Sequence, residues 1–196
     1  RRRVNFHAAG DPPPTPPGEL PDSVDVRQSS LFGSAWTAGS LKYMSEAGAS
    51  AVTYYESTGW RGVVERASGP ELPEKFRSRA GEVFPLYHAL ADVMGWRGAE
   101  VLLCESSNVL AAIGLAVREG GATRLLVANV TPVEQDVVVS PLDGEVSLRR
   151  LNESTAAEAG ADPKAFRGRS ESATAAGELA LTLQPYEVVR IDPVSA

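Results

Sequence analysis

A carboxylate residue directly follows the most aromatic run in the first half of the sequence. Glu56 follows residues 51–55 (AVTYY), a β-branched and aromatic segment of the length expected for a buried parallel strand. At the end of such a strand the carboxyl group would face a partly desolvated cavity, where it could act as a general acid or base. The alternative is a structural glutamate that pairs with Arg3, Arg27 or Arg61.

A second pair of charged residues lies upstream, at the end of a proline-rich segment. Arg27 could hold a carboxylate or a lactone carbonyl through two hydrogen bonds, and Asp25 could accept hydrogen bonds from sugar hydroxyls. The alternative is that Asp25 marks the start of a helix and that Arg27 is its ion-pair partner. The sequence leaves both interpretations of this pair open.

Four further residues are candidates for substrate contact or for the core. Trp60 lies in the loop after Glu56 and could stack on a sugar ring, whereas Trp36 lies in a predicted helix and is assigned to the core. Asn5 and His7 lie on a predicted strand over residues 2–8, Asn5 on the same face as two arginines and His7 near the strand end. We therefore predict that Trp60, Asn5 and His7 help to bind the substrate.

The sequence predicts neither a metal site nor a cofactor. His7 and His88 are the only two histidines, and no cysteine or carboxylate stands at ligand spacing from them. Zinc-protease, nucleophile-elbow, Walker and dinucleotide-binding motifs do not occur. His88 is predicted to be structural.

Composition narrows the class of protein and its partners. The formal net charge is −6 and the 19 basic residues are mostly dispersed, so we expect no nucleic-acid partner. Apolar runs fall short of the roughly 20 residues that a membrane helix needs, so we expect no membrane partner. The single cysteine, Cys104, is predicted to be a buried small hydrophobe, and its presence without a disulfide partner indicates a cytoplasmic protein.

In the first half of the chain, the elements that would position these residues are predicted to alternate between strand and helix, as in an α/β fold. A strand over 2–8, a loop over 10–23 with six prolines, a helix over 34–47, a strand over 51–55 and a helix over 82–95 follow one another. This order predicts that residues 1–95 are the last two strands and helices of a (β/α)₈ barrel. Active sites of such barrels lie at the C-terminal ends of the strands.

The second half, residues 96–196, reads as an antiparallel β-sandwich. Gly120-Gly121 and Asp143-Gly144 are predicted hairpin turns, and residues 154–176 a long loop or short helix. The predicted strands are 100–105, 109–118, 123–131, 134–140, 145–151, 179–184 and 186–192.

Two parallel strands cannot bury both faces of a sheet. We therefore expect the chain to be the C-terminal part of a longer enzyme, with the remainder of its own barrel as its partner. By itself it is predicted to be catalytically inactive.

Four segments carry a resemblance to a known family. Residues 25–65, 84–95, 123–132 and 178–192 resemble the C-terminal part of the D-apionate lactonase family. The resemblance implies a barrel like that of the clan A glycoside hydrolases, followed by a β-sandwich. It also implies hydrolysis of a sugar-derived lactone to its aldonic acid by an activated water. A carboxylate would be the base, and an arginine or asparagine would stabilise the oxyanion.

Two other functions stay open. One is a clan A-like glycoside hydrolase, in which a glutamate closes the seventh barrel strand. Here that place holds His7 or Ala8, which argues against a retaining glycosidase. The other is a non-catalytic sandwich. Residues 100–196 contain only two aromatic residues, Phe166 and Tyr186, so a structural role is favoured over carbohydrate binding.

Overall fold

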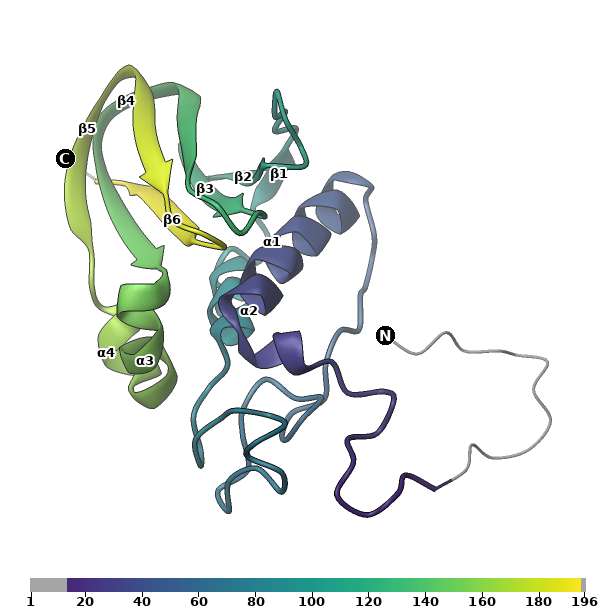
Figure 1. Cartoon of the computed structure of the whole chain (residues 1–196). Helices are drawn as coiled ribbons and strands as arrows, with labels where there is room; N and C mark the ends of the chain where they lie inside the picture. Colours follow the sequence, from purple (N-terminus) through teal and green to yellow (C-terminus); the bar gives the residue numbers. More distant parts are fainter. Residues whose placement is uncertain (1–13, 195–196) are drawn as a thin grey trace.

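The first half of the chain is built from helices and long loops. The computed structural model describes residues 14–194, so the predicted strand over 2–8 lies outside the described residues. An irregular segment leads into the 3₁₀ turn η1 (Val26–Ser29) and the helix α1 (Leu31–Glu46). The helix α2 (Pro85–Gly95) lies against α1 (Figure 1). The two helices predicted over 34–47 and 82–95 are thus confirmed.

Residues 51–55 differ from the prediction, because they form no strand. The isolated β-bridges of the described residues, Thr58 to Val64 and Val64 to Val83, do not include this segment. A β-branched and aromatic run becomes a strand only when a neighbouring strand satisfies its backbone N–H and C=O groups. The described residues offer no such neighbour, and the segment follows α1 without regular structure.

The second half is one antiparallel sheet of six strands. Their order across the sheet is β1-β2-β3-β6-β4-β5, and every neighbouring pair is antiparallel. Gly120 and Gly121, with φ of 57° and 83°, form the predicted hairpin turn between β2 and β3. The strands are β1 (Glu100–Leu102), β2 (Ala112–Glu119), β3 (Ala122–Asn129), β4 (Gln135–Leu151), β5 (Glu171–Leu183) and β6 (Val188–Pro193).

The strand β4 replaces two predicted strands. Asp143 and Gly144 are paired with β5 and do not form a hairpin turn. The register shift lies just before them, between Val139 and Leu142, so the chain passes through Asp143 and Gly144 as a continuous strand. Two short helices, α3 (Glu153–Ala161) and α4 (Pro163–Arg167), connect β4 to β5.

Both faces of the central strands are buried, one by helices and the other by the outer part of the same sheet. Leu115 and Val117 on β2 belong to a core shared with the helices α1 to α4. Ala116, between them, points to the opposite face and packs with Leu142 and Leu148 of β4. The sheet bends so that β4 and β5 cover the face opposite the helices (Figure 1).

A buried carboxylate joins α2 to the sheet. Asp92 on α2 is 3% exposed and accepts hydrogen bonds from three arginines on separate elements. Arg167 of α4 lies 2.8 Å away and Arg190 of β6 3.1 Å away, with Arg149 of β4 in the same contact. Because a buried charge is costly unless it is paired, this cluster fixes α2 relative to the sheet.

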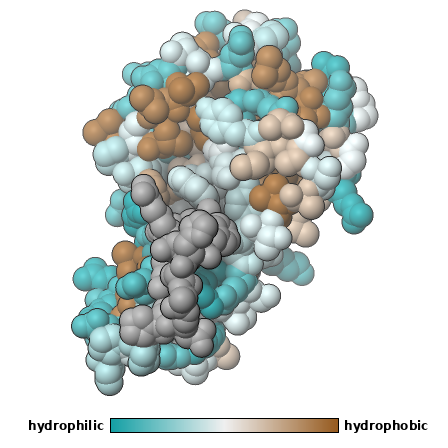
Figure 2. All heavy atoms as spheres, turned by 90° about the vertical axis from the view of Figure 1, so that its right-hand side faces the viewer, coloured by the Kyte–Doolittle hydropathy of each residue, from teal (hydrophilic) through white to brown (hydrophobic). Residues whose placement is uncertain are grey.

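Several large apolar side chains remain on the surface. Tyr43 and Met44 near the end of α1 are about half exposed, and Leu103 and Leu110 before β2 are more than three quarters exposed. Figure 2 shows hydrophobic side chains gathered on the upper half of one face. Exposed apolar surface of this kind is typical of contacts with another polypeptide segment. None of the helices within residues 14–194 has the length and apolar character to cross a membrane.

Candidate functional site

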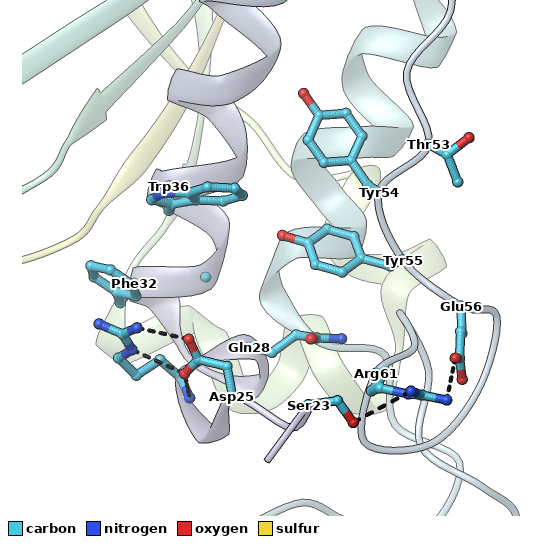
Figure 3. Close-up of a pocket in the computed structure, with 12 residues that line it drawn as sticks. Ser23, Asp25, Gln28, Phe32, Trp36, Thr53, Tyr54, Tyr55, Glu56 and Arg61 are labelled. Carbon is cyan, nitrogen blue, oxygen red and sulfur yellow. Dashed lines mark hydrogen bonds and ion pairs between the residues drawn. The ribbon is translucent and has the colours of Figure 1, made fainter. Parts of the chain in front are cut away.

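A cavity of about 510 Å³ lies between α1 and the segment that ends at Glu56. Figure 3 shows polar and aromatic side chains from both walls directed toward it. Three of the predicted site residues, Asp25, Arg27 and Glu56, line this cavity. The remaining lining residues are Ser23, Gln28, Phe32, Gly33, Trp36, Thr53, Tyr54, Tyr55 and Arg61.

Asp25 and Arg27 form a closed pair at the start of η1. The Asp25 carboxylate caps η1 by accepting the backbone N–H of Arg27 at 3.0 Å. It also accepts two guanidinium hydrogen bonds, at 2.9 Å and 2.7 Å. The side-chain hydrogen bond from Arg27 lowers the pKa of Asp25, so this carboxylate is ionised at neutral pH. The helix-entry interpretation of the pair is confirmed, and the pair also lies on the cavity wall.

The Arg27 guanidinium is further held by an aromatic ring. It lies 4.8 Å from the centroid of Phe32, which is on the first turn of α1. The close approach of η1 to α1 depends on Gly33. A Cβ atom at this position would lie 2.7 Å from the carbonyl oxygen of Gln28, closer than side chains tolerate. Gly33 therefore sets the position of the Asp25–Arg27 pair relative to α1.

Glu56 is paired with Arg61, one of the partners that the sequence suggests. Its carboxylate lies 2.5 Å from the Arg61 guanidinium, and its backbone N–H donates to the Arg61 carbonyl at 2.9 Å. The Glu56 side chain is 56% exposed, so the expected partly desolvated environment is absent from the described structure. Arg61 also reaches the Ser23 hydroxyl at 3.4 Å, which links the two loops at this end of the cavity.

Aromatic side chains form the two walls between these charged pairs. Trp36 lies one helical turn after Phe32 on α1, and Tyr54 and Tyr55 stack with ring centroids 5.9 Å apart on the opposite wall. Trp36 is 45% exposed, so its assignment to the core is wrong. It lines the cavity from α1 (Figure 3), and it is absent from the core that α1 shares with the sheet.

Hydroxyl groups attach the tyrosine wall to α1. Tyr54 donates to the Ser40 hydroxyl at 3.0 Å, and the Tyr55 hydroxyl lies 2.8 Å from that of Thr37. Thr37 in turn donates to the Gly33 carbonyl at 2.7 Å, so Tyr55 is the donor to Thr37. These bonds hold residues 53–55 in place although no strand forms there.

Trp60 does not line the cavity. It packs, partly buried, against the apolar cluster of Phe76, Phe84 and Leu86. Asn5 and His7, the other predicted contacts, lie outside the described residues. In the part of the chain that the structure describes, no three His, Cys, Asp or Glu side chains gather closely enough to hold a metal ion.

Two family models match the chain. The model described as D-apionate lactonase, TIM barrel domain, matches residues 4–98. The model described as D-apionate lactonase, C-terminal immunoglobulin-like domain, matches residues 110–191. No curated protein sequence matches the chain.

Solved structures resemble the fold at low sequence identity. A GH30 endoxylanase from Clostridium papyrosolvens has a TM-score of 0.59 at 8% identity, covering 85% of this chain and 39% of its own. A monomeric β-xylosidase from Caulobacter crescentus has a TM-score of 0.54 at 14% identity, covering 87% of this chain and 43% of its own. This chain thus spans about two fifths of the length of either protein. Its architecture is part of a TIM barrel followed by an antiparallel immunoglobulin-like sheet, and the chain belongs to the D-apionate lactonase family.

Proposed function

We propose that the enzyme of which this chain is the C-terminal part opens a sugar-derived lactone with water. The observation that carries this proposal is that Asp25, Arg27, Glu56 and Arg61 line the same cavity as a group of aromatic side chains. Aromatic rings can pack on the apolar faces of a sugar-derived ring, and the carboxylates can accept hydrogen bonds from its hydroxyl groups. Family membership supports the same class of substrate.

In the proposed reaction Glu56 is the base. Its carboxylate takes a proton from a water molecule while the water oxygen attacks the lactone carbonyl carbon. An oxyanion forms at the former carbonyl oxygen, and a neighbouring guanidinium, Arg61 or Arg27, stabilises it. The ring C–O bond then breaks, and the ring oxygen takes the proton back from Glu56 as a hydroxyl group. The product is the open-chain aldonic acid.

Glycoside hydrolysis is the alternative, and the state of Asp25 disfavours it. A glycosidase needs one protonated carboxyl group as the acid beside a second carboxylate. Asp25, which shares the cavity with Glu56, has a lowered pKa because Arg27 donates to it. It therefore cannot serve as that acid at neutral pH. Lactone opening requires only a base and an oxyanion partner, which the cavity supplies.

The sheet is proposed to have a structural role. Of the two aromatic residues within 100–196, Phe166 on α4 is 1% exposed, and Tyr186, between β5 and β6, packs edge-on against Phe32 at 5.4 Å. Neither is displayed as a carbohydrate-binding platform. We further propose that the exposed apolar side chains near α1 contact the remainder of the barrel, and that the enzyme works in the cytoplasm, where the free thiol of Cys104 stays reduced.

The test is a direct assay of the whole enzyme that contains this chain. Sugar 1,4-lactones and p-nitrophenyl glycosides would be offered in parallel, with acid release and p-nitrophenolate release as readouts. Hydrolysis of a lactone without hydrolysis of the glycosides is the expected result. Glycoside hydrolysis without lactone hydrolysis would refute the proposal.

A further inference from the structure

The cavity contains as many carboxylates as arginines, and they are paired within it. Asp25, Arg27, Glu56 and Arg61 are the only charged residues among the described lining residues. Arg27 donates twice to Asp25, through Nε at 2.9 Å and through a terminal nitrogen at 2.7 Å. Arg61 lies 2.5 Å from Glu56. The formal charges of the described lining residues therefore sum to zero, with one neutral pair on η1 and the other on the loop after residue 55.

We propose that this pairing selects the neutral ring of a lactone over the ring-opened carboxylate, an inference that rests on the proposed function. A carboxylate ligand binds tightly where a guanidinium offers it two free N–H donors. Here Asp25 takes the edge of Arg27 formed by Nε and one terminal nitrogen, and the Asp25 and Glu56 carboxylates repel a further anion. A neutral ring meets no such repulsion and can pack between the aromatic walls.

Ring opening would then turn a ligand that the site prefers into one that it repels. The reaction turns a neutral ring into an anion between two carboxylates that are already paired. Repulsion from Asp25 and Glu56 favours departure of the product, so Arg27 and Arg61 do not retain it. Asp25 and Glu56 thereby determine the specificity for lactone over carboxylate, because each forms an ion pair with one of the two arginines.

Single neutral substitutions can release one guanidinium at a time. Asp25→Asn keeps a side-chain oxygen that can cap η1 while it removes the charge next to Arg27. Glu56→Gln does the same for Arg61 at the other end of the cavity. Glu100→Gln is the matched control, because Glu100 pairs with Arg118 across β1 and β2, away from the cavity.

The experiment measures binding of D-ribono-1,4-lactone and of sodium D-ribonate to the full 196-residue chain by ligand-observed NMR at low salt. The wild-type chain should prefer the lactone. Asp25→Asn and Glu56→Gln should each raise ribonate affinity about three- to tenfold, an effect that added salt weakens. In both variants lactone affinity should change less than ribonate affinity, so that the lactone-to-ribonate ratio falls, and Glu100→Gln should behave as wild type.

Two results would overturn the inference. One is lactone binding by the wild type with an unchanged lactone-to-ribonate ratio in both variants. The other is that neither probe binds, which would show that the cavity is not the ligand-binding site. Since the two variants lie on different segments, a folding failure of one leaves the other as the test. The lactone assay on the whole enzyme decides the proposed function separately, because it measures turnover and not this ratio.

Discussion

The Asp92 carboxylate on α2 lies 3.1 Å from the Arg190 guanidinium on β6, although 98 residues separate them in the chain. Arg149 and Arg167 reach the same carboxylate from β4 and α4. One helix of the barrel part is thereby connected to three elements of the second half. The cavity is bounded by α1, which packs on α2, so the position of its α1 wall depends indirectly on this cluster.

Substitution Asp92→Asn should lower the free energy of unfolding by about 3–5 kcal/mol, because it leaves Arg149 and Arg167 without a counter-charge, while Arg190 keeps only its pair with Asp192. Urea denaturation followed by circular dichroism measures the change. The control is Asp136→Asn, an exposed residue on β4, which should change the value by less than about 0.5 kcal/mol. Equal effects of the two substitutions would show that the cluster contributes nothing special.

The two tryptophans of the first half should respond differently to truncation. Trp36→Ala removes part of the cavity wall and should weaken lactone binding by about tenfold with little change in stability, since Trp36 is 45% exposed. Trp60→Ala should instead lower the free energy of unfolding by about 1–3 kcal/mol, because Trp60 packs against Phe76 and Phe84. NMR titration and urea denaturation of both variants separate the two roles. A binding defect confined to Trp60→Ala would contradict the assignment.

Substitution Gly33→Ala should displace η1 from α1. The added Cβ would meet the backbone carbonyl oxygens of Gln28 and Arg27 at 2.7 Å and 2.9 Å, and backbone atoms cannot move aside cheaply. The expected cost is about 1–3 kcal/mol in the free energy of unfolding, together with weaker lactone binding. Gly95→Ala is the matched control, since nothing lies within 4 Å of its Cβ position. An unchanged Tm for Gly33→Ala would show that the close approach is not required.

Acid should destabilise the protein through His88. Burial lowers its pKa from 6.5 to about 4, while Nε2 lies 3.1 Å from the Ala159 carbonyl oxygen and Asp92, Arg149 and Arg167 lie nearby. Between these pH values the unfolded chain binds a proton that the folded chain does not bind. Stability contributed by neutral His88 is therefore complete above about pH 6.5 and is lost as the pH falls toward 4, by up to about 3 kcal/mol.

The matched variant is His88→Phe, which keeps a ring against Phe166 at the place where His88 lies 4.6 Å away. Its free energy of unfolding should fall less steeply between pH 6.5 and pH 4 than that of the wild type. Denaturation curves at several pH values measure both slopes. Parallel slopes would show that His88 is not held neutral in the fold.

Local patterns in the sequence predicted the elements that are complete within one segment. The helical spacing around Trp36 and Leu41 predicted α1, and Gly120-Gly121 predicted the β2–β3 hairpin. The strand expected over 51–55 did not form, because strand formation depends on a neighbour and not on composition alone. Likewise Asp143-Gly144 has the composition of a turn, yet pairing with β5 carries the strand through it.

The candidate site was only partly predictable for a related reason. Asp25, Arg27 and Glu56 were found by their charge and by their places at segment ends. Trp36 was missed because helical periodicity does not tell which side of α1 the sheet covers. Its signals were the aromatic residue one turn earlier, Phe32, and the pair Tyr54-Tyr55 directly before Glu56. Trp60 was misplaced since a loop residue can equally face an apolar cluster.

The central claim is that Glu56 is the base of a lactone-opening reaction in this cavity. Its most direct test is the rate of lactone hydrolysis by the whole enzyme that contains this chain, as wild type, Glu56→Gln and the control Glu100→Gln. The account predicts that Glu56→Gln lowers kcat by at least about 100-fold with a small change in KM, while Glu100→Gln matches the wild type. A kcat for Glu56→Gln within about threefold of the wild type would contradict it.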